Sequence, residues 1–416
     1  MQRTYESAAA FVGRATGPLA SHLGLFVTSL IAQQYAASVI HIKAQHALAL
    51  DRWLAKRRVV LVDLGEVHIE RYEHRRRLRQ QRIRTETRRR ERCDISQLLQ
   101  FLRGHGVCPT VRVETTASDD LVARYEQHLQ DQQGLATAAI ERYRTVAGRF
   151  LHERFDSSAV DLRALRADDV IAFVQRQTKR LRPPALKCVV NALRSFLRYA
   201  QYCGEVTIAL VAAVPTVAVW STTPSLPKAI SPEHAQRAIA SCDLSTSVGL
   251  RDRAVPLLLA RLGLRAHEII ALQLGDCDWD GGHLRVRSKS GREQLLPMPV
   301  EVGEAIAAYL QQGRPASKDR HLFLRSMAPI RGLMPGSDAI GTIVRNALQR
   351  AQIDAPHRGS HQFRHALAVR MLQGGASLAE IGEVLRHQSP QTTSIYARVD
   401  IGALRSLAQP WPGGAP

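Results

Sequence analysis

The C-terminal half of the chain contains charged and polar residues at spacings that place them on common helix faces. Arg265 and Glu268 are three residues apart, and His361 and Arg364 repeat that spacing. Residues three apart are neighbours on a helix surface, so each pair is predicted to share a face. A lysine in a polar turn, a histidine and a tyrosine complete the candidate set: Lys289, His387 and Tyr396.

These residue types fit the chemistry of a single phosphodiester. Attack on phosphorus adds negative charge to the phosphate oxygens, and two guanidinium groups can neutralise that charge without a metal ion. A tyrosine can attack reversibly, because a phosphotyrosyl linkage conserves the energy of the phosphodiester bond. A lysine can protonate a leaving 5′-oxygen, and histidines can transfer protons or hydrogen-bond to the phosphate.

Each candidate also has an ordinary structural explanation when it is taken alone. Arg265 and Glu268 could form a surface ion pair, which is common on helices. Tyr396 could be a core or interface aromatic. His361 could pack at a helix end, and we predict that role for His365. The functional interpretation depends on all positions fitting one chemistry together.

Four stretches together resemble the catalytic domain of the tyrosine recombinases, the phage integrase family. One stretch departs from the family, which usually has glycine where Arg386 stands. Any one match is weak evidence for the family, but several independent matches in the family's order and spacing are strong evidence. The stretches are Gly263-Leu264-Arg265-Ala266-His267-Glu268, Ser288-Lys289-Ser290-Gly291-Arg292, His361-Gln362-Phe363-Arg364-His365, and Leu385-Arg386-His387 with Thr392-Thr393-Ser394-Ile395-Tyr396.

The resemblance implies a role for each matching residue. Tyr396 would be the nucleophile that forms a 3′-phosphotyrosyl intermediate and releases a 5′-hydroxyl, and Lys289 would be the general acid. Arg265 and Arg364 would hold the scissile phosphate. No metal ion, ATP or other cofactor is implied. Two histidines and an orienting carboxylate would complete the pocket: His361, His387 and Glu268.

The charge balance independently points to nucleic acid. The 416 residues include 57 Lys and Arg against 37 Asp and Glu, which gives a net charge of +20. Arginine accounts for 50 of these cations, and its guanidinium binds phosphate through two parallel hydrogen bonds. A GC-rich genome would explain arginine over lysine but not the excess itself. The candidate DNA contacts are Arg75, Arg76, Arg77, Arg142, Arg194 and Arg386.

Hydrophobic periodicity and breakers predict a mainly α protein with a small antiparallel sheet in the last domain. A helix is predicted over 137–155, and a hairpin over 284–287 and 293–297. Pro256 is expected to kink its helix unless the helix starts later. The predicted organisation is an N-terminal helical extension (1–105), a helical core-binding domain (118–204), a linker (205–229) and the catalytic domain (230–409).

The N-terminal extension exceeds the two-domain pattern of the family. It contains an arginine-rich run, 71–92, with 11 arginines, which could be a solvated helix or tether as readily as a phosphate-binding surface. Residues 40–54 and 64–72 echo 140–155 and 165–173, which suggests an internal repeat. The extension could therefore be an arm-type DNA-binding domain, a duplicated core-binding bundle or an interaction module.

Cysteine usage and hydropathy bear on the expected compartment and partners. Six scattered cysteines form no CxxC motif, which favours reduced thiols in the cytoplasm. No apolar run is long enough for a membrane span. The expected partner is double-stranded DNA, with the protein acting as a homotetramer on two sites or with a partner recombinase.

The expected function is site-specific DNA recombination or integration, and we favour an enzyme of a mobile element. The alternative is a DNA-binding architectural or regulatory protein that has the fold without turnover, although every catalytic position is filled. A metal-dependent nuclease would need clustered carboxylates, which the last domain lacks. A type IB topoisomerase is a more distant option.

Overall fold

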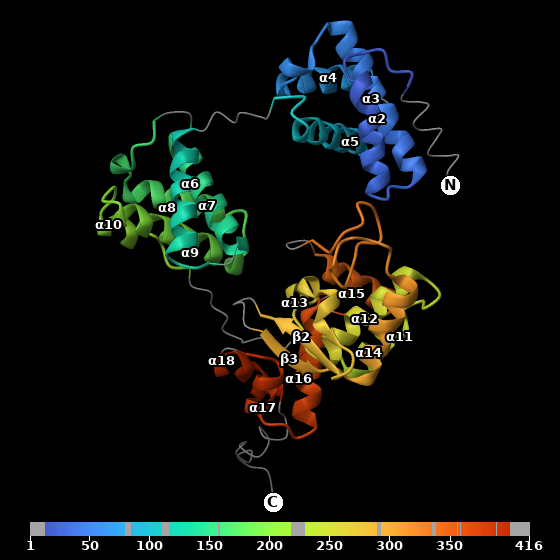
Figure 1. Ribbon diagram of the computed structural model, residues 1–416. Helices are drawn as coiled ribbons and strands as arrows, with labels where there is room; N and C mark the ends of the chain where they lie inside the picture. Colours follow the sequence, from blue (N-terminus) through green and yellow to red (C-terminus); the bar gives the residue numbers. More distant parts are fainter. Residues whose placement is uncertain are drawn as a thin grey trace, which may run out of the picture. The chain divides into compact units, whose positions relative to one another are not determined.

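In the computed structural model, the described residues form three separate hydrophobic cores, each built from elements that follow one another in sequence (Figure 1). Two compact units contain them, Met1–Arg112 with Ala229–His387 and Val113–Lys228 with Gln388–Pro416. The side chains of 77–79, 85–88, 138 and 399 are not described. The described residues are 13–79, 85–109, 116–135, 137–156, 159–217, 229–288, 293–334, 338–355, 357, 359–387 and 389–399.

The first core lies among helices coloured blue to cyan in Figure 1. Its first helix begins where the buried carboxylate of Asp51 accepts hydrogen bonds from the backbone N–H groups of Gly17 (2.9 Å) and Leu19 (2.8 Å). The bond from Leu19, the N-cap residue, satisfies a donor that the helix start leaves without an intrahelical partner, and the bond from Gly17 fixes the chain just before it. The elements are α2 (Ala20–Ala32), α3 (Ala37–Arg57), η1 (Leu61–Asp63), α4 (Glu66–Arg79) and α5 (Thr85–Gly104).

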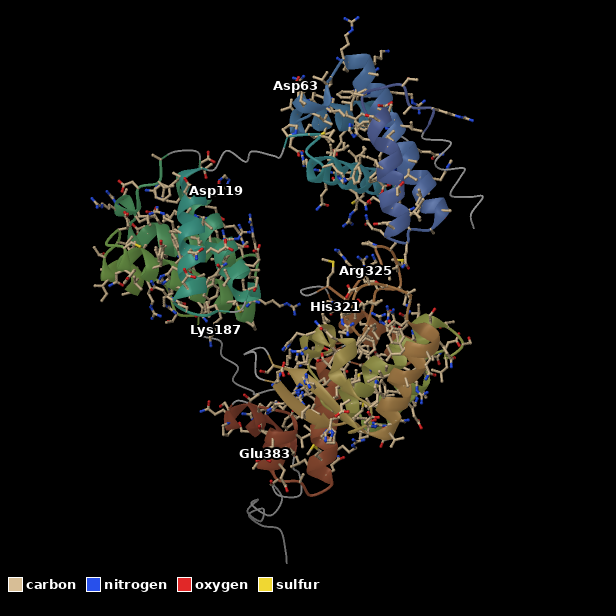
Figure 2. The ribbon with its side chains drawn as sticks, in the orientation of Figure 1. Asp63, Asp119, Lys187, His321, Arg325 and Glu383 are labelled. Carbon is tan, nitrogen blue, oxygen red and sulfur yellow. The ribbon has the colours of Figure 1, made fainter. Side chains whose placement is uncertain are left out.

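The second core contains the predicted helix over 137–155, which is confirmed as α7 (Thr137–Phe155). Its first helix begins with a capping box, in which Thr116 and Asp119 (labelled in Figure 2) exchange hydrogen bonds. The stretch expected to be a linker is partly helical, because Leu210 and Val214 are buried in this core. The other elements are α6 (Ala117–Asp131), η2 (Leu162–Ala164), α8 (Ala167–Thr178), α9 (Pro183–Tyr202) and α10 (Ile208–Ala212).

The first two cores are built from the same order of elements. In each, two helices are followed by a short 3₁₀ turn and two further helices: α2, α3, η1, α4 and α5, then α6, α7, η2, α8 and α9. Buried residues after the turn recur in the same order, as Leu64, Ile69 and Tyr72 and then as Leu165, Val170 and Phe173. The element order therefore supports the predicted internal repeat.

The third core holds the only β-sheet within the described residues, with three antiparallel strands in the order β1-β2-β3. The predicted hairpin is confirmed, since β2 pairs with β3 from Arg287 opposite Glu293 to His283 opposite Pro297. Its elements up to the sheet are α11 (Pro232–Ala240), α12 (Ser247–Arg261), α13 (Ala266–Ala271), η3 (Leu274–Asp276), β1 (Cys277–Asp278), β2 (His283–Arg287) and β3 (Glu293–Pro297).

The helix that contains Pro256 does not start late enough to place the proline in its first turn. α12 begins at Ser247, where the Thr246 hydroxyl accepts a hydrogen bond from the Gly249 N–H, and it continues through Pro256. Its long buried stretch fixes the helix in the core despite the missing donor. The remaining elements are α14 (Val300–Ala308), the π-helical turn η4 (Tyr309–Gly313), α15 (Ala339–Arg350), α16 (His361–Gln373), α17 (Leu378–Val384), α18 (Pro390–Thr393) and the 3₁₀ helix η5 (Ser394–Val399).

Helices predominate in all three cores, which confirms the predicted mainly α fold with a small antiparallel sheet. Among the described residues, none of the helices combines the length and the apolar character that crossing a bilayer requires.

Candidate active site

Arg265 and Glu268 are fixed to each other by the start of α13. Arg265 is the N-cap residue, and its backbone N–H donates to Glu268 Oε2 at 2.9 Å. Its Nη1 donates to Glu268 Oε1, also at 2.9 Å. Glu268 is 1% exposed, whereas the Arg265 side chain is 27% exposed. The predicted pair is therefore not a surface ion pair: the carboxylate is buried and the guanidinium reaches solvent.

Gly263 forms the turn that leads into this pair. It has a φ of +56°, and a Cβ there would lie 2.7 Å from Leu385 Cδ2 and 3.1 Å from Leu367 Cδ2. Its carbonyl oxygen accepts hydrogen bonds from Arg364 Nη1 and, at 3.4 Å, from Arg386 Nη2. The turn therefore needs a residue without a side chain, and it ties two arginines to the start of α13.

Replacing Gly263 with alanine should lower the free energy of unfolding by about 1–3 kcal/mol, because the new Cβ meets both an unfavourable φ and the Leu385 side chain. Urea unfolding of the two proteins measures the difference. Gly275→Ala is the matched control, since a Cβ there meets nothing within 4 Å. Equal stability of Gly263→Ala and wild type would contradict the tight turn.

Arg364 connects three elements at the centre of the site. It lies on α16, its side chain is buried, and its two terminal nitrogens donate to the carbonyls of Gly263 and Leu385. Gly263 precedes α13, and Leu385 ends α17. A single guanidinium thus holds the two backbone segments that carry Arg265 and His387.

Arg386 is placed differently from the expectation that it contacts DNA. It follows α17 in the left-handed conformation, with φ of +54°, and its N–H donates to the carbonyl of Glu383 (labelled in Figure 2). Its side chain is 7% exposed and its Nη2 donates to Glu268 Oε2 at 2.8 Å. Burial of the guanidinium on a carboxylate argues against a DNA contact in this arrangement. The left-handed backbone also explains why glycine suits this position.

Glu268 remains ionised among these arginines. Burial by itself would raise its pKa, but the hydrogen bond from the Arg265 backbone and the charges of Arg386 and Arg265 lower the pKa below its usual value. The site therefore carries a negative charge bound to two guanidinium groups.

Three histidines face the arginines and are held neutral. Burial, followed by the charges of Arg364 and Arg265, lowers the pKa of His361 and lowers that of His387 to about 4. Burial, the neighbouring His361 and Arg364 lower the pKa of His365 to about 4. Sequence reasoning assigned His365 to packing, and its position beside His361, at 6.4 Å between ring centroids, is the signal that it belongs to the polar cluster.

The lowered pKa values predict loss of stability in mild acid. His365 and His387 are neutral in the folded protein down to about pH 4, whereas the unfolded chain takes up their protons from about pH 6.5. The free energy of unfolding should therefore fall by about 1–2 kcal/mol for each of the two histidines between pH 6.5 and pH 5. Urea unfolding at several pH values measures this fall. The free energy of unfolding should depend less steeply on pH in His365→Gln. An unchanged pH dependence in that variant would show that His365 does not contribute to the loss of stability in acid.

Two further residues are predicted to be catalytic, Tyr396 and Lys289. Tyr396 lies on η5 and its side chain is 1% exposed. Lys289 lies outside the described residues, between β2 and β3 in the sequence. The other five are gathered by the contacts above: Arg265, Glu268, His361, Arg364 and His387.

The candidate DNA contacts on the helical bundles have varied environments. Arg142 is exposed on α7, and Arg194 lines a hollow of about 350 Å³ while donating to the carbonyl of Val214 at 3.1 Å. Arg75 is half-buried, and Arg76 is paired with Glu91 at 2.7 Å. The side chain of Arg77 lies outside the description.

The described residues contain no group of three or more His, Cys, Asp or Glu side chains arranged to hold a metal ion. The carboxylate of this polar cluster, Glu268, is bound to Arg265 and Arg386. The polar cluster is therefore cationic, and it suits an anionic group rather than a cation.

Comparison with known proteins places the chain in a family. Residues 228–402 match the phage integrase family. The integrase/recombinase homologue y4rA of Sinorhizobium fredii is 44% identical over 96% of both chains. The tyrosine recombinase XerD of Ralstonia nicotianae is 30% identical over 72% of this chain and 96% of its own. The solved XerH recombinase in its post-cleavage complex has a similar fold, with a TM-score of 0.54 at 19% identity over 70% of this chain and 84% of its own. The chain therefore belongs to the phage integrase family of tyrosine recombinases, which are site-specific DNA recombinases.

Proposed function

We propose that this protein cleaves and rejoins duplex DNA through a 3′-phosphotyrosyl intermediate, without a metal ion or ATP. The observation that carries the proposal is the joining of Arg265 and Arg364 by the Gly263 turn, within a cluster of neutral histidines. Two guanidinium groups beside one another match the two non-bridging oxygens of a phosphodiester and the charge that develops on them.

The remaining roles follow from the chemistry of each group. The Tyr396 hydroxyl gives its proton to a neutral histidine of the site as its oxygen attacks phosphorus. The phosphotyrosyl bond forms while the bond to the 5′-oxygen breaks, and Lys289 gives that oxygen a proton. His361 and His387, neutral at physiological pH, can hydrogen-bond to the phosphate without adding charge. The buried position of Tyr396 suits a nucleophile whose ester must be shielded from water until the second strand attacks.

Metal independence separates this proposal from a nuclease that works through bound metal ions. We expect cleavage of the target DNA to proceed at an unchanged rate in excess EDTA and without ATP, since the arginines supply the charge stabilisation. A nuclease using metal ions would lose cleavage and recover it on adding Mg²⁺. Loss of activity in EDTA would contradict the proposed mechanism.

The first helical bundle supports a further contact with the DNA backbone. A cavity of about 850 Å³ surrounds Trp53 and is lined by Arg57, Arg71, Arg75 and Arg92, together with two histidines and two glutamates. A second hollow of about 370 Å³ on Trp53 is lined by further cations and no carboxylate. We propose that this basic surface binds phosphates, with Arg142 and Arg194 doing so on the second bundle.

Salt dependence tests the basic surface. Each lost phosphate contact reduces the slope of log affinity against log salt by about 0.9, so Arg71→Gln with Arg75→Gln should flatten the slope by about 1.8. Fluorescence anisotropy with a labelled duplex at several salt concentrations measures it. The control, Arg14→Gln with Arg103→Gln, removes equal charge outside the cavity, and Arg103 is already paired with Glu66 at 2.7 Å. Equal slopes in both variants would show that the arginines of the cavity do not bind DNA phosphates.

The partner proposed for this chain is double-stranded DNA, bound by four protomers on two sites or by this protein with a second recombinase. Two strand exchanges on two duplexes need four nucleophiles, which is the stoichiometric reason for the tetramer. The additional N-terminal bundle favours a mobile-element enzyme as the biological setting.

A further inference from the structure

Arg386 has no part in the proposed chemistry, yet it is a more enclosed partner of Glu268 than Arg265 is. Its side chain is 7% exposed against 27% for Arg265. Besides the bond to Glu268, its Nη1 donates to the carbonyl of Leu262 at 3.3 Å. Its Nε has no hydrogen-bond partner among the described residues. A buried guanidinium with an unsatisfied donor is costly, so its presence calls for an explanation.

The contacts of Arg386 close a ring around Glu268. The Arg386 carbonyl accepts a hydrogen bond from Arg265 Nη2 at 3.1 Å, while its own Nη2 donates to Glu268 Oε2 at 2.8 Å. Arg265 Nη1 donates to the other carboxylate oxygen, Oε1, at 2.9 Å. The two oxygens of one buried carboxylate are therefore bound to two different guanidinium groups.

Glycine at this position would keep most of the ring. The left-handed backbone at Arg386, with φ of +54°, is one that glycine adopts readily, so the carbonyl would still accept from Arg265. What arginine adds is a positive charge in contact with Glu268. With Arg265 alone, the pair would be neutral; with both arginines, the ring keeps one net positive charge.

We propose that Arg386 is a positioning residue that offsets the charge of Glu268 and so leaves the charge of Arg265 available to the scissile phosphate. The proposal rests on the function proposed above, in which Arg265 binds that phosphate. Charges interact strongly in a partly buried site because water screens them less there than at the surface. Arg386 thus acts through Glu268 and Arg265 without itself touching DNA.

Substitution of Arg386 tests the idea in the full-length protein. Arg386→Gly should form the covalent DNA adduct about tenfold more slowly, less than the loss expected for a direct donor to the phosphate. Its affinity for DNA and its melting temperature should stay close to wild type, because glycine suits the backbone. Arg386→Lys should recover most of the rate by restoring the charge. Arg370→Gln, which removes an exposed charge on the same unit, should leave the rate unchanged.

A double-mutant cycle separates the electrostatic role from simple loss of packing. In a Glu268→Gln background no negative charge remains to offset, so adding Arg386→Gly should slow the adduct no further. A second tenfold loss in that background would overturn the proposal. So would a loss in Arg386→Gly that Arg386→Lys does not recover.

A titration of the free protein gives a readout that needs no catalysis. His387 faces the charges of Arg364, Arg265 and Arg386 and the ring of His365. NMR of ¹³C-labelled histidines should show a raised pKa for His387 in Arg386→Gly and a value near wild type in Arg386→Lys. An unshifted His387 overturns the proposal. If the His387 pKa shifts as expected but even the wild-type protein forms no DNA adduct, the charge effect of Arg386 is supported and the proposed function is refuted.

Discussion

Replacing Tyr396 with phenylalanine should abolish the covalent protein–DNA adduct and all strand cleavage. Phenylalanine lacks the oxygen that forms the phosphotyrosyl bond. The ring itself is retained, so the packing of this buried side chain should change little. Denaturing gel electrophoresis of the protein with labelled DNA measures the adduct, which should fall below detection.

Two controls accompany the Tyr396→Phe experiment. Affinity for the same DNA, measured by anisotropy, should stay within about twofold, because the phosphate contacts come from arginines. Tyr309→Phe removes another buried tyrosine oxygen, one that accepts a hydrogen bond from the Leu324 N–H, and should leave the adduct in place. An adduct that persists in Tyr396→Phe would show that another residue is the nucleophile.

Replacing Arg364 with lysine should slow cleavage by about 100- to 1,000-fold, the usual consequence of losing one preorganised donor to the transition state. Lysine keeps the charge but has one terminal nitrogen in place of two, so it cannot reproduce the planar fork in which separate nitrogens bind the carbonyls of Gly263 and Leu385. Single-turnover cleavage of a nicked duplex, which traps the covalent product, measures the rate.

The Arg364 result needs a check on folding, because the side chain is buried at the junction of three elements. The melting temperature of Arg364→Lys identifies a folded variant, and Arg350→Lys is the matched exchange at an arginine outside the phosphate site. Arg350 donates to Cys242 Sγ at 3.4 Å and lies on α15. A folded Arg364→Lys protein that cleaves within tenfold of wild type would remove Arg364 from the phosphate site.

The helices and the hairpin were predictable because their signals are local. Thr137 to Phe155 shows a clear apolar face, and the helix has those bounds. The start of α9 at Pro183 is less evident from sequence, because proline breaks a helix in its interior but fits its first turn. α10 was missed, because a five-residue helix depends on Leu210 reaching a core formed elsewhere in the chain.

The site was predictable in its residue types but not in their contacts. The spacing of Arg265 and Glu268 predicted a shared helix face, whereas the capping arrangement that buries Glu268 depends on the turn at Gly263. The contacts of Arg386 with Leu262 and Glu268 were missed because these partners are more than a hundred residues away in sequence. Contacts of that range depend on tertiary packing, which no local pattern encodes.

The most direct test of the phosphotyrosyl mechanism is covalent capture followed by mapping of both ends of the adduct. Wild-type protein is incubated with sheared DNA from around its own gene and denatured, and the attached DNA is sequenced while the modified peptide is identified by mass spectrometry. We predict nucleotide attached through a 3′-phosphate to Tyr396, at one recurring DNA sequence, with no adduct from Tyr396→Phe. Attachment through a 5′-phosphate or to another residue would contradict this account.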